Sequence, residues 1–394
     1  MLLRAFVVKN KKLPFLLAFV YYITNGVIQY RTQNFLESPY CNTAPIQPYL
    51  GFVHLTPLRA CRMGLQKFDE RMEMNVGKNS IVTLIVFLMA ALSCTQQKTK
   101  PEKSSKWPDK VKVAAVQTCG FDKWLKIKEG CSPVESVVKY IERAAADDVQ
   151  LVVFPEYHLG RISVPGPQSR KISKAAAENG IYVIVGCWEV FEDETFSSAA
   201  LLFGREGNIV GKYYKTHAAV DTYDELPAYS KPPSGKDKQW FIENDPEWIM
   251  KRGNNLPVFE LDFGRIGILI CYDGYFPETY SVLSLKGAEI IVWINGRGGR
   301  IQDYYVRTFM EQNLVSMICT NQDYGAGTML AQYPNKIDAI CRQTGEGYIT
   351  AEFDLKRLRF ARKNSRNFQQ RRPELYKEIT MPHQIWEDYK NIRK

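Results

Sequence analysis

The chain has 394 residues, of which 45% are hydrophobic and 24% are charged, a composition that excludes a largely disordered protein. Its formal net charge is +10, but ten of the 52 Lys and Arg and only four of the 42 Asp and Glu fall in residues 1–93, so the rest of the chain is mildly basic. Because no zinc-finger spacing or RNP-like aromatic motif accompanies that charge, we expect no nucleic-acid partner.

Export is predicted from residues 72–94. Lys78 precedes an unbroken apolar run, 81–91, which is too short for a comfortable transmembrane helix and is followed by small residues. The ending Ala-Leu-Ser-Cys resembles a bacterial lipobox, in which Cys94 carries lipid and becomes the mature N-terminus, although Ala91 stands where Leu is usual. The pattern predicts a signal peptide and a lipid-anchored protein of the bacterial cell envelope, facing the periplasm or the exterior, with an uncleaved anchor as the alternative.

Residues 1–71 carry no recognisable chemistry, and two interpretations stay open for them. Either the start is assigned too early, since Met72 and Met74 suit a start codon, or the apolar stretch 13–28 is a genuine membrane segment. The charged residues 95–106 indicate a flexible tether. The folded domain is therefore expected over 107–377, with a tail over 378–394.

Within that domain, short apolar runs alternate with helical patterns. Strands are expected at 112–118, 151–155, 181–186, 199–203, 209–214, 258–261, 266–271, 289–294 and 317–320. Helices are expected from Pro133 to about 145 and at 168–179, 277–286 and 303–316, and a basic helix follows 355. Ser132, Pro133 and Glu135 suggest a capping box at the first helix. The alternation predicts a single α/β domain of layered sheets and helices.

Residues 221–254 interrupt this alternation with a stretch rich in Pro, Ser, Lys and aromatic residues. A long loop inside a compact domain is usually functional, so we expect a lid or substrate-binding loop there. The nine cysteines include no CxxC pair and no regular spacing, which indicates neither a metal site nor a disulfide framework. We expect most of them to be buried small apolar residues, including Cys119, Cys131, Cys187, Cys319 and Cys341.

Three reactive side chains come just after predicted strands: Glu156, Lys215 and Cys271. Ligands of open α/β sheets bind beyond the carboxyl ends of the strands, so these side chains can converge on one crevice. A thiol needs a neighbouring base or cation to become a thiolate, and Glu156 can take its proton and later return it to a departing amine. Lys215 and the backbone N–H of Tyr272 can stabilise the oxyanion that forms when sulfur attacks a carbonyl.

The motifs around these residues are FPEYHLG, GKYYKTH and GILICYDGYFPE, and GAEIIVWIN, EQNLVSMICTNQDYG and DLKRLRFARKNSRNFQQRRPELY follow them. This order, over about 111–377, resembles the nitrilase superfamily of carbon-nitrogen hydrolases. The resemblance implies a four-layer α-β-β-α sandwich that pairs its sheets across a dimer, and a homodimer or larger homo-oligomer. It also implies Glu156 as base, Lys215 as oxyanion stabiliser and Cys271 as nucleophile.

Members of that superfamily often have a second glutamate between the Lys and the Cys, which hydrogen-bonds the lysine and orients the substrate. In this chain the insert offers Glu225, Glu243 and Glu247. Glu247 lies shortly before Gly253, as the glutamate does before a Gly turn in the superfamily, and is favoured. Glu225 remains a competitor.

The expected reaction is hydrolysis of a small linear amide or N-carbamoyl amine, with water as the second substrate and with no metal or organic cofactor. Nitrile hydrolysis, acyl transfer from a thioester to an amine, and a catalytically silent binding protein of the same fold are the alternatives. A rival Cys271–His pair would use His158 or His217. The motifs favour Glu and Lys over histidine, and His217 is expected beside the site.

Overall fold

The computed structural model describes residues 4–8, 16–24, 27–35, 106–219 and 238–381. The chain divides into two units, Met1–Glu102 and Lys103–Lys394. In the first, β1 (Arg4–Val8), β2 (Leu16–Thr24) and β3 (Val27–Phe35) form an antiparallel sheet, and most of the apolar stretch 13–28 falls on these strands. None of the described helices has the length and apolar character to span a membrane. The expected signal peptide, with Cys94, and the tether up to residue 105 lie outside the described residues.

The second unit contains two sheets that face each other. The strands of the first, in spatial order, are β16 (Gly347–Asp354), β4 (Lys110–Gln117), β5 (Leu151–Val153), β7 (Tyr182–Val190), β8 (Phe196–Phe203) and β9 (Ile209–Tyr214), and the short β6 (Arg161–Ser163) pairs with β7. The strands of the second are β10 (Val258–Leu261), β11 (Gly264–Ile270), β12 (Ile290–Ile294), β13 (Ser316–Thr320), β14 (Met329–Gln332) and β15 (Lys336–Ile340). Every strand predicted from the sequence is present.

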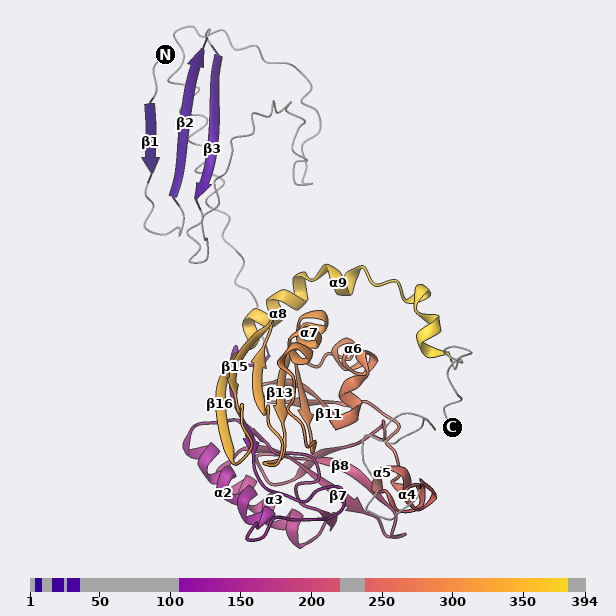
Figure 1. The fold of residues 1–394 in the computed structure, drawn as a ribbon. Coiled ribbons are helices and arrows are strands. Elements are labelled where there is room, and N and C mark those ends of the chain that lie inside the picture. The colour runs from indigo at the N-terminus through magenta and orange to yellow at the C-terminus, as the bar shows by residue number, and fades with distance from the viewer. Residues whose placement is uncertain (1–3, 9–15, 25–26, 36–105, 220–237, 382–394) are drawn as a thin grey trace. The chain divides into compact units, whose positions relative to one another are not determined.

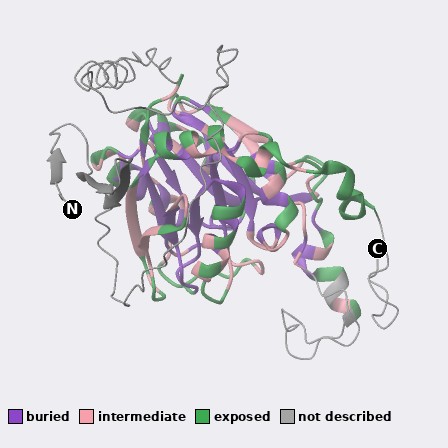
Figure 2. Ribbon diagram, turned by 90° about the horizontal axis from the view of Figure 1, so that it is seen from above, coloured by how far each residue is buried: buried purple, intermediate pink, exposed green. Residues whose placement is uncertain are grey.

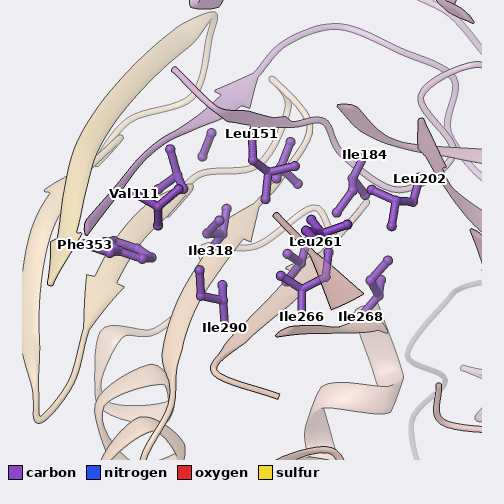
Figure 3. Close-up of a cluster of buried hydrophobic side chains, with 14 of the residues drawn as sticks. Val111, Leu151, Ile184, Leu202, Leu261, Ile266, Ile268, Ile290, Ile318 and Phe353 are labelled. Atoms are coloured by element: carbon purple, nitrogen blue, oxygen red, sulfur yellow. The ribbon is translucent and has the colours of Figure 1, made fainter. Parts of the chain in front are cut away.

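Alternation along the strands explains why the sheets stack. In β11, Ile266 and Ile268 point into the space between the sheets, whereas Leu269 packs on the opposite face. Side chains two residues apart share one face of a strand, so each strand of this kind supplies two apolar layers. Figure 3 shows the inner layer, in which Ile184 of the first sheet and Ile268 of the second belong to one cluster.

Helices cover both outer faces (Figure 1). On the first sheet lie α2 (Pro133–Ala146) and α3 (Pro167–Asn179), which bury residues such as Ile141 and Ile172 against it. On the second lie α6 (Pro277–Leu285) and α7 (Asp303–Asn313), which bury Leu283 and Met310. The predicted α-β-β-α sandwich is therefore confirmed. Both sheets belong to one chain and share one core. Pairing across a dimer stays a prediction.

Two local predictions are also wrong. Helix α2 begins at Pro133 as expected, but Ser132 makes no side-chain cap hydrogen bond, and Glu135 instead binds Lys171 of α3. Cys119 and Cys131 are not simple packing residues, because they form a disulfide across a separation of 12 residues. The spacing pattern missed this pair because loop folding, and not a repeated motif, brings the two sulfur atoms together. Cys187 and Cys319 are buried and free, as expected.

The chain after β16 forms an extended arm, residues 355–381, which we call the C-terminal arm. It contains α8 (Leu355–Asn364), α9 (Arg366–Gln369), η2 (Pro373–Leu375) and η3 (Lys377–Thr380). Leu358 is buried against the core, whereas Phe360 and Ile379 are 67% and 60% exposed. Figure 2 shows buried residues concentrated on the strands and exposed ones along this arm.

Candidate active site

The three reactive side chains lie at strand ends and line one cavity. Lys215 directly follows β9, Cys271 directly follows β11, and Glu156 comes shortly after β5. The cavity has a volume of about 600 Å³, within the range of small-molecule sites. Its lining consists of Asp122, Lys123, Trp124, Glu156, Tyr157, Lys215, Ala219, Glu247, Cys271, Tyr272, Tyr275, Gly296, Arg297, Gly298, Gly299 and Tyr324.

Cys271 occupies a tight turn where β11 gives way to the short 3-10 helix η1 (Cys271–Tyr275). Its φ is 45°, a left-handed conformation that costs a non-glycine residue free energy and that clusters at functional sites. The indole Nε1 of Trp293 donates a 2.8 Å hydrogen bond to the carbonyl of Cys271 and holds the turn. A Cβ on Gly274 would lie 2.3 Å from the Trp293 ring, so only glycine lets this close packing form. The neighbouring Tyr272 also lines the cavity.

Lys215 lies between two carboxylates in the buried wall of the cavity. Its Nζ is 3.0 Å from Glu156 Oε1 and 2.7 Å from Glu247 Oε1, and all three side chains are almost completely buried. The other oxygen of Glu156 accepts a 2.9 Å hydrogen bond from the backbone N–H of Gly296, just beyond β12. Residues from both sheets therefore orient Glu156, because its lysine partner follows β9 and its amide partner follows β12.

Glu247 is held by a short helix inside the insert. The predicted loop contains α4 (Lys238–Asn244) and α5 (Pro246–Ile249), so its second part is helical. Asp245 caps α5 through a 2.9 Å bond to the backbone N–H of Glu247. Glu247 Oε2 accepts a 2.9 Å hydrogen bond from the N–H of Ala219, and Oε1 also accepts one from the Tyr157 hydroxyl.

The other two candidate glutamates do not meet Lys215 in the described residues. Glu243 is exposed on α4 and accepts a hydrogen bond from Gln239. Glu225 lies outside the described residues. The structure thus brings Glu247, among these described side chains, to the position beside the lysine.

The charges of this cluster follow from burial and pairing. Burial raises the pKa of Glu156, Lys215 opposes that shift, and the nearby negative charge of Glu247 adds to it. Burial would also raise the pKa of Glu247, but Lys215 and the hydrogen bonds outweigh it and lower that pKa. Burial would lower the pKa of Lys215, yet the two carboxylates hold it well above its usual value. Glu247 and Lys215 therefore form the charged pair, and Glu156 is the carboxylate most ready to bind a proton.

The thiol of Cys271 carries its proton before a substrate arrives. Burial, and then the negative charge of Glu156, raise the pKa of Cys271 to about 12, although Lys215 and Arg297 act in the opposite direction. A protonated thiol beside a carboxylate of raised pKa can become nucleophilic by passing its proton to that carboxylate during attack. The arrangement suits covalent acyl chemistry.

Asp273 is a buried carboxylate that the sequence analysis did not identify. Its Oδ1 accepts hydrogen bonds from the backbone N–H groups of Thr216 (3.2 Å) and His217 (2.8 Å), and its Oδ2 accepts 2.7 Å from the Tyr213 hydroxyl. It thereby ties the segment around Lys215 to the turn of Cys271. A charged residue two positions after a reactive cysteine is the signal that could have indicated it.

The two histidines of the rival pair do not line the cavity. His217 stacks on Phe276, with ring centroids 4.0 Å apart, and its Nδ1 lies 2.9 Å from Asp273. His158 is buried, and burial lowers its pKa to about 4. The geometry therefore favours Glu156 over either histidine as the partner of Cys271.

Comparisons with known proteins agree with this fold. Residues 112–363 match the model of the carbon-nitrogen hydrolase family. An N-carbamoylputrescine amidase of Arabidopsis thaliana is 26% identical over 236 residues, covering 54% of this chain and 72% of the relative. A nitrilase of Pyrococcus abyssi is 25% identical over 264 residues, covering 60% of this chain and 90% of the relative.

Solved structures resemble the fold. A carbon-nitrogen hydrolase from Helicobacter pylori superposes with a TM-score of 0.54 at 17% identity, covering 69% of this chain and 99% of the other. A nitrilase-superfamily protein of Saccharomyces cerevisiae gives 0.54 at 20% identity, covering 69% and 100%. The chain belongs to the carbon-nitrogen hydrolase family. It is accordingly an enzyme of the nitrilase superfamily.

Proposed function

We propose that this enzyme hydrolyses a small linear amide or N-carbamoyl amine through a thioester on Cys271. The observation that carries the proposal is the convergence of Cys271, Glu156 and Lys215, from three separate strand ends, on one cavity. The 3.0 Å contact between Lys215 and Glu156 supports their acting together.

The proposed reaction divides into two halves. Glu156 takes the proton of the Cys271 thiol as sulfur attacks the carbonyl carbon, and the oxyanion is stabilised by Lys215 and the backbone N–H of Tyr272. Glu156 then protonates the departing amine, and a thioester remains. Water, deprotonated by the same carboxylate, attacks the thioester and releases the acid and the thiol. Glu247 keeps Lys215 charged and oriented through its 2.7 Å contact.

Replacement of the nucleophile tests this proposal. Cys271→Ala should abolish the release of ammonia or amine, whereas Cys341→Ala, at a free cysteine outside the cavity, should retain it. Glu156→Gln removes the base of both half-reactions and should lower the rate by about 100- to 10,000-fold. Wild-type rates in the Cys271→Ala protein would contradict the mechanism.

Nitrile hydrolysis is a second candidate, because a relative that is 25% identical is a nitrilase. The same thiol could attack a nitrile carbon and form a thioimidate, which water converts to the thioester with release of ammonia. Ammonia yields from nitriles and amides of the same carbon skeleton separate the two candidates. If kcat/KM is higher for the nitriles than for the amides, nitrile hydrolysis is the main activity.

We also propose that the enzyme is exported and anchored through lipid on Cys94. The Cys119–Cys131 disulfide supports export, since disulfides persist in oxidising compartments and are rare in the cytosol of mesophiles. Mass spectrometry of the N-terminal peptide from membrane-extracted protein tests it. Lipid on Cys94, and release of a Cys94→Ala protein from membranes, are the expected results; an intact, unlipidated residue 1–94 segment contradicts the proposal.

Self-association is proposed on the basis of the C-terminal arm. Phe360 and Ile379 expose large apolar surfaces there, and such surfaces are commonly buried between subunits. Light scattering should give a mass of at least two chains, and Phe360→Ser with Ile379→Ser should lower it. A monomer at micromolar concentration would contradict this assembly.

A further inference from the structure

Arg297 lines the cavity, and its positive charge has no role in the proposed reaction. It follows Gly296, whose N–H holds the carboxylate of Glu156, so it lies next to the reacting groups. Its backbone N–H is fixed by Asn321 at 3.0 Å. Its guanidinium donates a hydrogen bond to the hydroxyl of Tyr275 and lies 5.3 Å from the centre of that ring.

The pairing of Arg297 differs from that of the other cations in the wall. Lys215 contacts Glu156 and Glu247, and Lys123 contacts Asp245 at 2.8 Å. Arg297 has only the neutral Tyr275 as its side-chain partner in the part of the chain that the structure describes. A guanidinium has five N–H donors, and a single phenol oxygen leaves most of them for another acceptor.

The carboxylates of the wall do not cancel this charge. Glu247 and Glu156 both pair with Lys215, at 2.7 Å and 3.0 Å, and among the described residues no hydrogen bond or ion pair joins either of them to Arg297. Asp122 accepts hydrogen bonds from the backbone N–H groups of Trp124 (2.8 Å) and Lys126 (2.9 Å), which ties its Oδ1 to its own loop. The part of the cavity beside Arg297 is therefore suited to a negatively charged group.

We propose that Arg297 binds a carboxylate of the substrate, so that the enzyme prefers amides or ureido compounds that carry an acid group over neutral ones. This inference rests on the proposed function and deepens it. The planar fork of a guanidinium matches a carboxylate in a bidentate geometry. The aromatic wall of Tyr275 and the open space beside Gly298 and Gly299 leave room for a short chain between the acid and the scissile bond.

The acid can belong to either half of the substrate, and the probes distinguish these sources. Glutaramate, the monoamide of glutaric acid, carries it on the acyl side, and pentanamide is its neutral counterpart. N-carbamoyl-β-alanine carries it on the amine side, and N-propylurea is its neutral counterpart. Within each pair, kcat/KM should favour the charged member by about 10- to 100-fold, as expected for a charge-assisted hydrogen bond.

Arg297→Gln should reduce that preference to less than about threefold, chiefly by raising KM for the charged member. Arg300→Gln removes the same charge from an exposed position of the same loop and should leave the preference intact. Equal kcat/KM values for charged and neutral members in the wild type, or an unchanged preference in Arg297→Gln, would overturn the proposal.

Binding to Cys271→Ala protein separates this inference from the proposed function and serves if Arg297→Gln fails to fold. Calorimetry should show tighter binding of glutaramate or N-carbamoyl-β-alanine than of the neutral counterpart. If the charged compounds bind more tightly but the wild type does not hydrolyse them, the anion site is supported and the proposed amidase activity is refuted. If neutral and charged amides are hydrolysed with equal kcat/KM, the amidase activity is supported and the anion site is refuted.

Discussion

The hydroxyl of Tyr213, near the end of β9, donates a 2.7 Å hydrogen bond to the buried carboxylate of Asp273, two residues beyond Cys271. Tyr213 precedes Lys215 by two residues, so this one bond connects the segments that carry two of the three reactive side chains. Asp273 also accepts hydrogen bonds from the Thr216 hydroxyl at 2.8 Å and from backbone N–H groups, including that of Ile270 at 3.1 Å. Asp273 thus aligns the turn that carries Cys271 with the strand that precedes Lys215, although Asp273 does not line the cavity.

Asp273→Asn should destabilise the fold and lower kcat. The amide would replace one of the two acceptor oxygens by an NH2 group, which cannot accept a hydrogen bond from the backbone N–H groups that now donate to Asp273. Buried donors would be left without acceptors, at a cost of about 2 to 4 kcal/mol. Tyr213→Phe removes one donor alone and should cost about 1 kcal/mol. Denaturant unfolding and steady-state kinetics measure both effects. An Asp273→Asn enzyme with wild-type stability and kcat would show that this link is unnecessary.

Glu247→Gln should move the acidic limb of the kcat/KM profile to lower pH. In the wild type the charge of Glu247 contributes to the raised pKa of Glu156, and removal of that charge lets Lys215 lower it. Because the proposed base must be unprotonated to accept the thiol proton, activity then persists to lower pH. At neutral pH the rate should fall about tenfold as Lys215 loses its charged partner.

Glu243→Gln is the matched control for that profile, since Glu243 is an exposed glutamate of the same insert. Its pH profile should coincide with that of the wild type. An acidic limb that stays in place in Glu247→Gln would mean that Glu156 and Glu247 do not interact as described.

His158 should make the protein less stable as the pH falls. Burial holds its pKa at about 4, whereas the unfolded chain has a histidine pKa of about 6.5. Below about 6.5 the unfolded state binds a proton that the folded state does not, so the free energy of unfolding decreases as the pH falls toward 4. The decrease amounts to at most about 3 kcal/mol.

His158→Gln removes this titration. Unfolding free energies measured at pH 7 and pH 4.5 should differ by less in the variant than in the wild type. Equal differences in the two proteins would show that His158 is not the group responsible.

Reduction of the Cys119–Cys131 disulfide should raise KM more than it lowers kcat. The disulfide closes a loop that contains Lys123 and Trp124, both of which line the cavity, and Lys123 contacts the Asp245 cap of α5. Opening a loop of this size should lower the free energy of unfolding by about 3 kcal/mol. The thiol of Cys271 is not altered by reduction, so the chemical step should change little.

The double variant Cys119→Ser with Cys131→Ser provides the same comparison without a reductant, and Cys341→Ser controls for the loss of an unrelated thiol. Initial rates over a range of amide concentrations give KM and kcat for each protein. Identical KM values in the oxidised, reduced and variant enzymes would exclude a role for the disulfide in holding this loop.

Local patterns in the sequence were enough to predict a layered α/β domain. The run 266–271 is continuously apolar because its side chains serve two buried faces, and it appears as β11 with Cys271 just beyond it. The same logic placed Glu156 and Lys215 at strand ends, and parallel strands bring their carboxyl ends to one edge. Order along the chain and apolar periodicity therefore predicted a layered α/β domain with three reactive residues at strand ends, and the resemblance to the nitrilase superfamily implied the four-layer sandwich.

Contacts between distant segments decided the rest. Among three glutamates of the insert the sequence favoured Glu247 only by its position before Gly253, whereas in the structure the Asp245 cap and the bond from Ala219 hold it beside Lys215. The partnership of Cys119 with Cys131 and the position of Arg297 in the wall of the cavity likewise depend on loops without periodicity. Sequence patterns report which face of an element is buried; the identity of a side chain's partner across the core depends on how the packed elements meet.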